Sequence, residues 1–183
     1  VFPLLEILPL DDQEALRAAL RELDRYALIA FVSPNAIDAA FAARPDWPWH
    51  IPLAVVGEGS RMALLRHGAS KANATIVSPT DLERTDSETL LAELDLPALR
   101  GKQVLIIRGE TGRELLGDTL RAAGIGVTPL AAYRRVAPEW NSARRSELKR
   151  LLSCQNDWIV TSSEGLRFLT EMVAQLDLSL IHI

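Results

Sequence analysis

The stretch LIAFVSPNAI, residues 28–37, joins an apolar run to a serine turn and the start of a helix. A run of this kind is typical of a buried parallel strand, and Ser33 at its end is well placed to cap the next helix. A similar stretch, WIVTSSEGL, recurs at residues 158–166, with Ser162 in the corresponding place. The first turn of a helix has unpaired N–H groups that suit an anion. Either both serines only cap helices, or two similar α/β units face each other across a cleft.

Apolar runs alternate with helical patterns along the rest of the chain. Further strands or extended segments are expected at residues 53–56, 75–77, 102–107, 126–130 and 131–136, and helices at 14–23, 34–43, 61–66, 86–94, 114–122 and 139–153. Alternation of this kind predicts parallel sheets with helices on both faces. Residues 1–8, interrupted by Pro3 and followed by Pro9, predict an edge strand or a linker, because proline lacks a donor for a central strand.

Two glycine turns also follow expected strands, so Ser33, Gly57 and Arg108 are predicted to share the edge of a parallel sheet at which ligands bind. The first, GEGS at 57–60, lacks the third glycine of a dinucleotide fingerprint, and the second, RGETGR at 108–113, lacks the Lys-Ser or Lys-Thr of a nucleotide phosphate loop. Both fit an anion cradle, because glycine lets N–H groups approach a ligand and Arg108 can bind a carboxylate. Tight turns without a ligand remain the alternative.

Composition excludes several classes of function. The 183 residues are 48% hydrophobic and 24% charged, with a net charge of −4, which argues against a nucleic-acid binder that depends on bulk positive charge. The single cysteine, Cys154, excludes an internal disulfide and is expected to be a half-buried structural thiol. The sequence has no apolar run of about 20 residues, the length that predicts a membrane span. No signal peptide is visible either, so a cytoplasmic setting is expected. An enzyme without a nucleophile–base pair, paired carboxylates or a metal motif would work by positioning and electrostatics.

Several segments, in their order and spacing, resemble the uroporphyrinogen-III synthase family. The resemblance extends to about residue 176 and rests on FVSPNA at 31–36, VVG at 55–57, DSE at 86–88, LIIRGE at 105–110, GRELL at 112–116, YRR at 133–135 and TSS at 161–163. It implies an α/β fold with two doubly wound parallel-sheet domains joined by a two-stranded ribbon, the second domain only partly present.

The domain boundaries follow from the same resemblance. Residues 1–9 and 131–138 would form the ribbon, residues 10–130 an inserted α/β domain, and residues 139–183 part of the second domain. A strand expected before residue 1 and a turn expected after about residue 180 are not in the sequence. The chain is therefore expected to be a fragment that lacks one wall of the cleft between its domains.

The resemblance also implies an activity. Family members cyclise hydroxymethylbilane to uroporphyrinogen III, inverting ring D and losing water, without a metal or organic cofactor. A cytoplasmic monomer with no nucleic-acid or membrane partner is expected. Tyr133 matches the ribbon tyrosine of the family, and its phenol can donate to the leaving oxygen, unless it only packs in the ribbon. The groups expected to hold substrate carboxylates are at Ser33, Asn35, Gly57, Ser60, Arg108, Gly109, Thr161 and Ser162.

Two other functions remain as alternatives. The first is a non-catalytic, two-lobed binding module for an anionic metabolite, which needs the same anion-binding turns but no chemistry. The second is a nucleotide-dependent transferase, which the incomplete glycine motifs at 57–60 and 108–113 disfavour.

Overall fold

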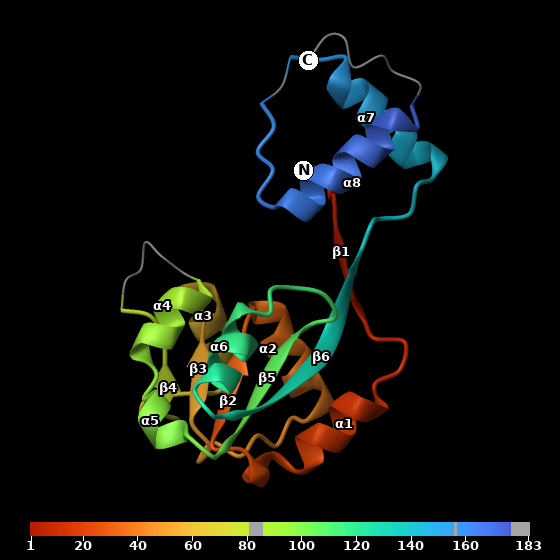
Figure 1. The fold of residues 1–183 in the computed structure, drawn as a ribbon. Coiled ribbons are helices and arrows are strands. Elements are labelled where there is room, and N and C mark those ends of the chain that lie inside the picture. The colour runs from red at the N-terminus through yellow and green to blue at the C-terminus, as the bar shows by residue number, and fades with distance from the viewer. Residues whose placement is uncertain (81–85, 156, 177–183) are drawn as a thin grey trace. The chain divides into compact units, whose positions relative to one another are not determined.

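A computed structural model describes residues 1–80, 86–155 and 157–176 (Figure 1). The chain divides into two compact units. The larger unit is Leu8–Arg134, and the smaller unit combines Val1–Ile7 with Arg135–Ile183.

The strands of the described residues form one six-stranded sheet in the order β1-β6-β5-β2-β3-β4. They are β1 (Glu6–Pro9), β2 (Leu28–Phe31), β3 (Leu53–Val55), β4 (Ile76–Val77), β5 (Gln103–Gly109) and β6 (Gly126–Val136). The pairs β2–β3, β2–β5, β3–β4 and β5–β6 are parallel, which confirms the predicted parallel sheet. Of the N-terminal segment, expected to be an edge strand or a linker, residues 6–9 form the edge strand β1. The two extended segments expected at 126–136 are one strand.

Side-chain capping explains where several helices begin. The helices are α1 (Glu14–Arg21), α2 (Pro34–Ala43), α3 (Glu58–Arg66), α4 (Ser87–Glu93), α5 (Leu96–Leu99), α6 (Leu115–Ala122), α7 (Ser142–Leu152) and α8 (Ser163–Ala174), with a 3-10 turn at Leu23–Arg25. The Ser33 hydroxyl accepts the N–H of Ala36 at the start of α2, and Asp86 forms a capping box with Thr89 at the start of α4. Ser162 caps α8 in the same way.

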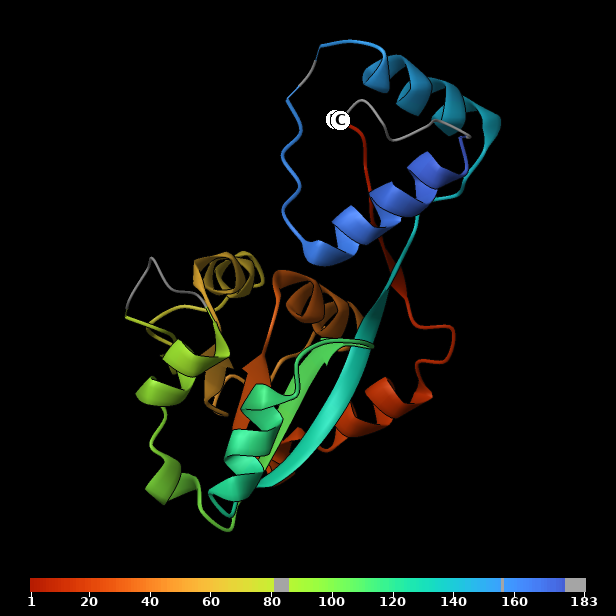
Figure 2. The ribbon, with the colours of Figure 1, turned by 45° about the horizontal axis from the view of Figure 1, so that its top comes forward.

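Helices cover both faces of the sheet in the larger unit (Figures 1 and 2). Alternate residues of a strand point to opposite faces. On one face Ile29, Phe31, Leu105 and Ile107 pack with buried residues of α1, α2 and α3. On the other face Leu28, Ala30, Val104 and Ile106 pack with buried residues of α4 and α6. This two-sided burial explains why β2 and β5 are continuous apolar runs.

The smaller unit contains the helices α7 and α8 and corrects two expectations. Its apolar cluster consists of Leu148, Phe168, Met172, Val173 and Leu176, against which Phe2, Leu4 and Leu5 pack. The strand expected at 158–160 is wrong, because these residues form no strand and Ile159 is 89% exposed. Without a neighbouring strand, an apolar run has no hydrogen-bonded ladder to join. Cys154 is exposed rather than half-buried.

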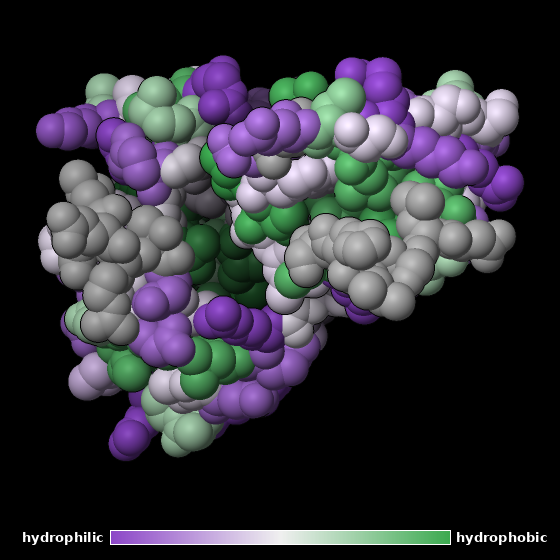
Figure 3. All heavy atoms as spheres, turned by 90° about the horizontal axis from the view of Figure 1, so that it is seen from above, coloured by the Kyte–Doolittle hydropathy of each residue, from purple (hydrophilic) through white to green (hydrophobic). Residues whose placement is uncertain are grey.

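Exposed large apolar side chains occur in both units. Among the described residues they are Val1, Ile7, Met62, Leu65, Leu115, Trp158, Ile159 and Leu166. In the space-filling view of Figure 3, apolar residues are interspersed with hydrophilic ones over the visible face.

Helix α3 begins earlier than the sequence predicts. Residues 58–60, expected in a loop, form its first turn. Arg61 donates to both carboxylate oxygens of Glu58, at 2.7 and 2.6 Å, one turn apart on this helix. These hydrogen bonds hold the pKa of the Glu58 carboxyl below its usual value of 4.5. The same contacts raise the pKa of Arg61.

Hydrogen exchange will distinguish the central strand from the extended segment of the smaller unit. Amides 104–107 should be protected at least about a thousandfold more than amides 158–160. Opening β5 disrupts the core of the larger unit, whereas residues 158–160 belong to no strand or apolar cluster. Amides 148–152 of α7 serve as the control for the stability of the smaller unit. Equal protection at 104–107 and 158–160 would contradict this assignment.

The Glu58–Arg61 pair should make stability depend on acid pH. Because the folded-state pKa of Glu58 is lowered, the pair stabilises the fold above about pH 4.5, and this contribution is lost as the pH falls through the lowered value. Urea unfolding of Glu58→Gln and Arg61→Gln should therefore show a smaller loss of stability between about pH 5 and pH 3 than the unchanged protein. An undiminished loss in both variants would show that the pair does not contribute.

Candidate functional site

The carboxyl ends of the central parallel strands reach one edge of the sheet at the same level. Phe31 at the end of β2 is opposite Val55 of β3 on one side and Ile107 of β5 on the other. Two residues beyond this level are Ser33, Gly57 and Gly109. We call this edge, formed by residues 32–35, 56–58, 108–110 and 131–134, the rim. The prediction that Ser33, Gly57 and Arg108 share one edge of a parallel sheet is confirmed.

The order of the strands reverses at the centre of the rim. From β2 the chain continues to β3 and β4 on one side, and the later strands β5 and β6 lie on the other side of β2. In sheets of this kind ligands bind outside the strand ends at the point of reversal. That point lies between β2 and β5, and two residues beyond the Phe31–Ile107 pair are Ser33 and Gly109. We therefore place the candidate site there.

Tyr133 contributes a phenol to this point. It lies in β6, opposite Gly109, after a register shift between Arg108 and Gly109. Its ring belongs to the core and is only 4% exposed, and its hydroxyl is 3.1 Å from the Ser33 hydroxyl, so that either oxygen can be the donor. The N–H of Glu110 donates to the Tyr133 carbonyl at 2.9 Å, which fixes the backbone of the strand end. The structure thus brings together two of the residues that the sequence predicted, Ser33 and Tyr133.

Gly109 provides space for this ring. A Cβ at this position would lie 3.0 Å from the Cζ of Tyr133 and 3.2 Å from its hydroxyl oxygen. Contacts this short force the neighbouring ring to move. The sequence indicated a glycine turn here, but the reason for the glycine, a tyrosine on the adjacent strand, depends on the sheet.

Arg108 is buried at the rim and already has an acidic partner. It is 9% exposed, and its Nη1 donates to Glu114 at 2.6 Å. Gly112 closes the loop over it with a positive φ of 157°, and a Cβ there would lie 2.9 Å from Arg108 Nη2. To bind a ligand carboxylate, Arg108 would have to share its charge with Glu114. The sequence signal for this pair was the short spacing between the arginine and the acid, which the interpretation as an anion cradle did not use.

The other predicted binding residues lie in different surroundings. Asn35 is partly buried in the first turn of α2, and Gly57 precedes α3, whose first residue is the paired acid Glu58. Ser60 is 3% exposed inside α3 and presents no open surface. Thr161 and Ser162 belong to the smaller unit, where Thr161 is exposed and Ser162 accepts the N–H of Gly165 at 3.0 Å.

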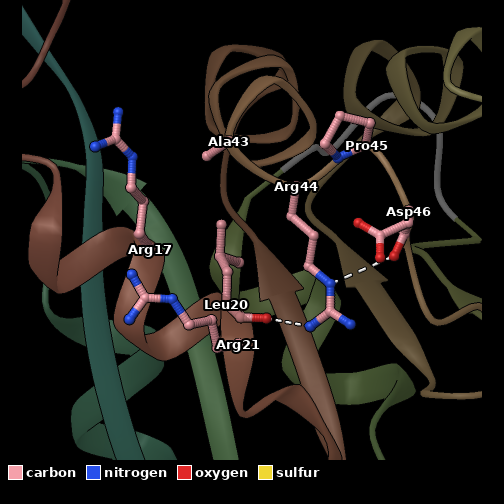
Figure 4. Close-up of a pocket in the computed structure, with 7 residues that line it drawn as sticks. All are labelled: Arg17, Leu20, Arg21, Ala43, Arg44, Pro45 and Asp46. Carbon is pink, nitrogen blue, oxygen red and sulfur yellow. Dashed lines mark hydrogen bonds between the residues drawn. The ribbon is translucent and has the colours of Figure 1, made fainter.

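A concavity of about 380 Å³ lies where α2 ends (Figure 4), whereas the rim lies where α2 begins. It is lined by Arg17, Leu20, Arg21, Ala43, Arg44, Pro45 and Asp46. Arg44 donates to the carbonyls of Leu20 and Asp46. In Figure 4 the guanidinium groups of Arg17 and Arg21 point away from that of Arg44. The three cations therefore do not converge on one ligand position.

The described residues, 1–80, 86–155 and 157–176, contain neither a candidate metal-binding cluster nor a helix able to span a membrane. No group of three or more His, Cys, Asp or Glu side chains among them could hold a metal ion. No helix among them is long and apolar enough to cross a membrane.

Solved structures share this fold. Uroporphyrinogen-III synthetase from Helicobacter pylori 26695 superposes with a TM-score of 0.62 at 15% identity, over 92% of this chain and 69% of that chain. A mutant uroporphyrinogen III synthase from the extremely thermophilic bacterium Thermus thermophilus gives a TM-score of 0.58 at 17% identity, over 93% of this chain and 66% of that chain. At these identities the likeness establishes the fold alone.

Sequence comparisons establish the family. A family model described as "Uroporphyrinogen-III synthase HemD" matches residues 1–182. Uroporphyrinogen-III synthase of Escherichia coli K12 is 33% identical over 181 residues, and that of Salmonella typhimurium LT2 is 31% identical over 176. Each match covers 95% of this chain and 70% of the relative, so the chain spans about 70% of the length of these proteins. The chain belongs to the uroporphyrinogen-III synthase family.

Proposed function

We propose that this protein cyclises hydroxymethylbilane to uroporphyrinogen III, with inversion of ring D and loss of water. Membership of the family supports the activity. The observation that supports a particular location for this activity is a pair of hydroxyl groups. Those of Tyr133 and Ser33 lie 3.1 Å apart where the strand order reverses.

The chemistry requires a folded substrate and a donor for its leaving hydroxyl group. Bringing ring D to the far end of a flexible tetrapyrrole can contribute about 7–11 kcal/mol when the reacting atoms are well oriented. A neutral phenol can donate a hydrogen bond to the leaving oxygen. Tyr133 is the proposed donor.

The first turn of α2 is the proposed contact for a substrate carboxylate. Pro34 has no N–H, and the N–H groups of Ala36 and Ile37 donate to Ser33. In the described part of the chain, the backbone N–H of Asn35 has no such partner. A carboxylate placed there would also interact favourably with the positive end of the helix dipole. Gly57, Arg108, Thr161 and Ser162 remain proposed contacts without a comparable argument.

The domain organisation belongs to the same proposal. The chain passes between the two units at residues 7–8 and again at residues 134–135. Both crossings lie within the proposed ribbon of residues 1–9 and 131–138, whose strands β1 and β6 are neighbours in the sheet. These positions support residues 10–130 as an inserted domain and residues 139–183 as part of a second one.

Incubation with hydroxymethylbilane tests the activity. The protein should produce the type III isomer in excess over the type I isomer that forms spontaneously, as measured by chromatography of the oxidised porphyrins. Substrate binding without a change in the isomer ratio would favour the non-catalytic binding module. Neither binding nor type III product would contradict both functions.

Replacement of the phenol tests the role of Tyr133. Tyr133→Phe should lower kcat about tenfold, or by about 1.4 kcal/mol, with little change in KM, because it removes one neutral hydrogen bond. Tyr26→Phe is the matched control, since Tyr26 is the other tyrosine and is 5% exposed in the same core cluster. Unchanged turnover and isomer ratio in Tyr133→Phe would show that Tyr133 only packs, whereas complete loss would indicate an essential acid.

A further inference from the structure

We propose that Ser33 and Gly109 are positioning residues for the Tyr133 phenol. Ser33 holds the phenol oxygen through a hydrogen bond, and Gly109 admits the ring because it has no Cβ. This inference rests on the proposed function of Tyr133. It assigns a different role to two residues that the sequence predicted to bind substrate carboxylates.

Ser33 is itself held in place by helix α2. Its backbone is extended, with φ −163° and ψ 158°, and its hydroxyl oxygen accepts the N–H of Ala36 at 3.2 Å. Pro34 at the first helical position restricts the backbone further. The Ser33 oxygen is therefore fixed relative to the start of α2, and the phenol that bonds to it at 3.1 Å is fixed as well.

Ser33 and Tyr133 together have two hydroxyl hydrogens, one of which forms the hydrogen bond between them. A serine hydroxyl accepts two hydrogen bonds and donates one. The Ala36 N–H occupies one acceptor position of Ser33. If Ser33 donates to Tyr133, the phenol hydrogen is left for the ligand. If Tyr133 donates to Ser33, both acceptor positions of the serine are filled and its own hydrogen is left. In either case the pair offers one hydroxyl hydrogen, at the start of α2.

Gly109 restricts the ring from the other side. Tyr133 is 4% exposed and its ring is enclosed by the core, so it has little space in which to move. An alanine Cβ would contact the ring at 3.0 Å from Cζ. The ring would have to move by a few tenths of an ångström. Because the oxygen–oxygen separation from Ser33 is already long for two hydroxyl groups, at 3.1 Å, such a movement is expected to weaken the hydrogen bond.

A spectroscopic test follows from the tyrosine content. The chain has two tyrosines, so Tyr26→Phe leaves Tyr133 as the single reporter. With ¹³C at the tyrosine Cζ, the NMR resonance of Tyr133 should shift in Ser33→Gly and in Gly109→Ala and return toward its original position in Ser33→Thr. Glycine is used at position 33 because, of the residues without a side-chain acceptor, it is tolerated best at a helix start. Asn141→Gly, which removes the capping side chain of α7, is the control and should leave the resonance unmoved.

Kinetics separate positioning from substrate binding. Ser33→Gly and Gly109→Ala should each lower kcat about tenfold and leave KM within about twofold, because the phenol is misplaced and the carboxylate contacts remain. Ser33→Thr should recover most of the activity. The double variant Ser33→Gly/Tyr133→Phe should be no slower than Tyr133→Phe alone, because both changes remove one interaction.

The outcomes distinguish this inference from the proposed function. An unmoved Cζ resonance in Ser33→Gly would overturn the positioning role whether or not the protein is active. A shifted resonance with unchanged kcat, a rise in KM alone, or additive losses in the double variant would overturn it too. Failure of the unchanged protein to form the type III isomer would instead count against the proposed function.

Discussion

The pairing of β2 with a parallel strand on each side is the constraint on which the rest of the larger unit depends. Phe31 is opposite both Val55 and Ile107, so β2 and β3 end at one level, two residues before the end of β5, and the residues that follow meet at the rim. A slip of one residue would exchange the two faces of each strand and place Ile29 and Phe31 among the wrong helices. The same register sets Gly109 beside Tyr133 and brings the phenol to Ser33.

Charged side chains at and beside the rim largely form ion pairs with other residues of the chain. Arg108 pairs with Glu114, and Arg61 pairs with Glu58 at the start of α3. What the centre of the rim offers is neutral: two hydroxyl groups and a first-turn N–H. The two hydroxyl groups suit the reacting end of the proposed substrate, and the first-turn N–H suits one of its carboxylates. This division also suits a reaction that depends on folding the substrate.

The sequence predicted the parallel sheet, the edge strand, the helix starts at Ser33 and Asp86, and the shared edge of Ser33, Gly57 and Arg108. These features depend on local patterns: apolar runs, proline positions and capping residues. The strand expected at 158–160 had the same local pattern and does not form, because a strand requires a partner that periodicity does not reveal. Ser60 was similarly misleading, since its place inside α3 depends on where that helix begins.

By itself, the sequence determined the family, the α/β class and the strand ends at which a site should lie, because these follow from the order of local segments. Only the tertiary structure decided how those ends are used. The Ser33–Tyr133 hydrogen bond joins residues 100 positions apart, and the space beside Gly109 exists only because β6 lies next to β5. Which donor meets which acceptor depends on strand order and register, which are set by packing across the whole sheet rather than by neighbours along the chain.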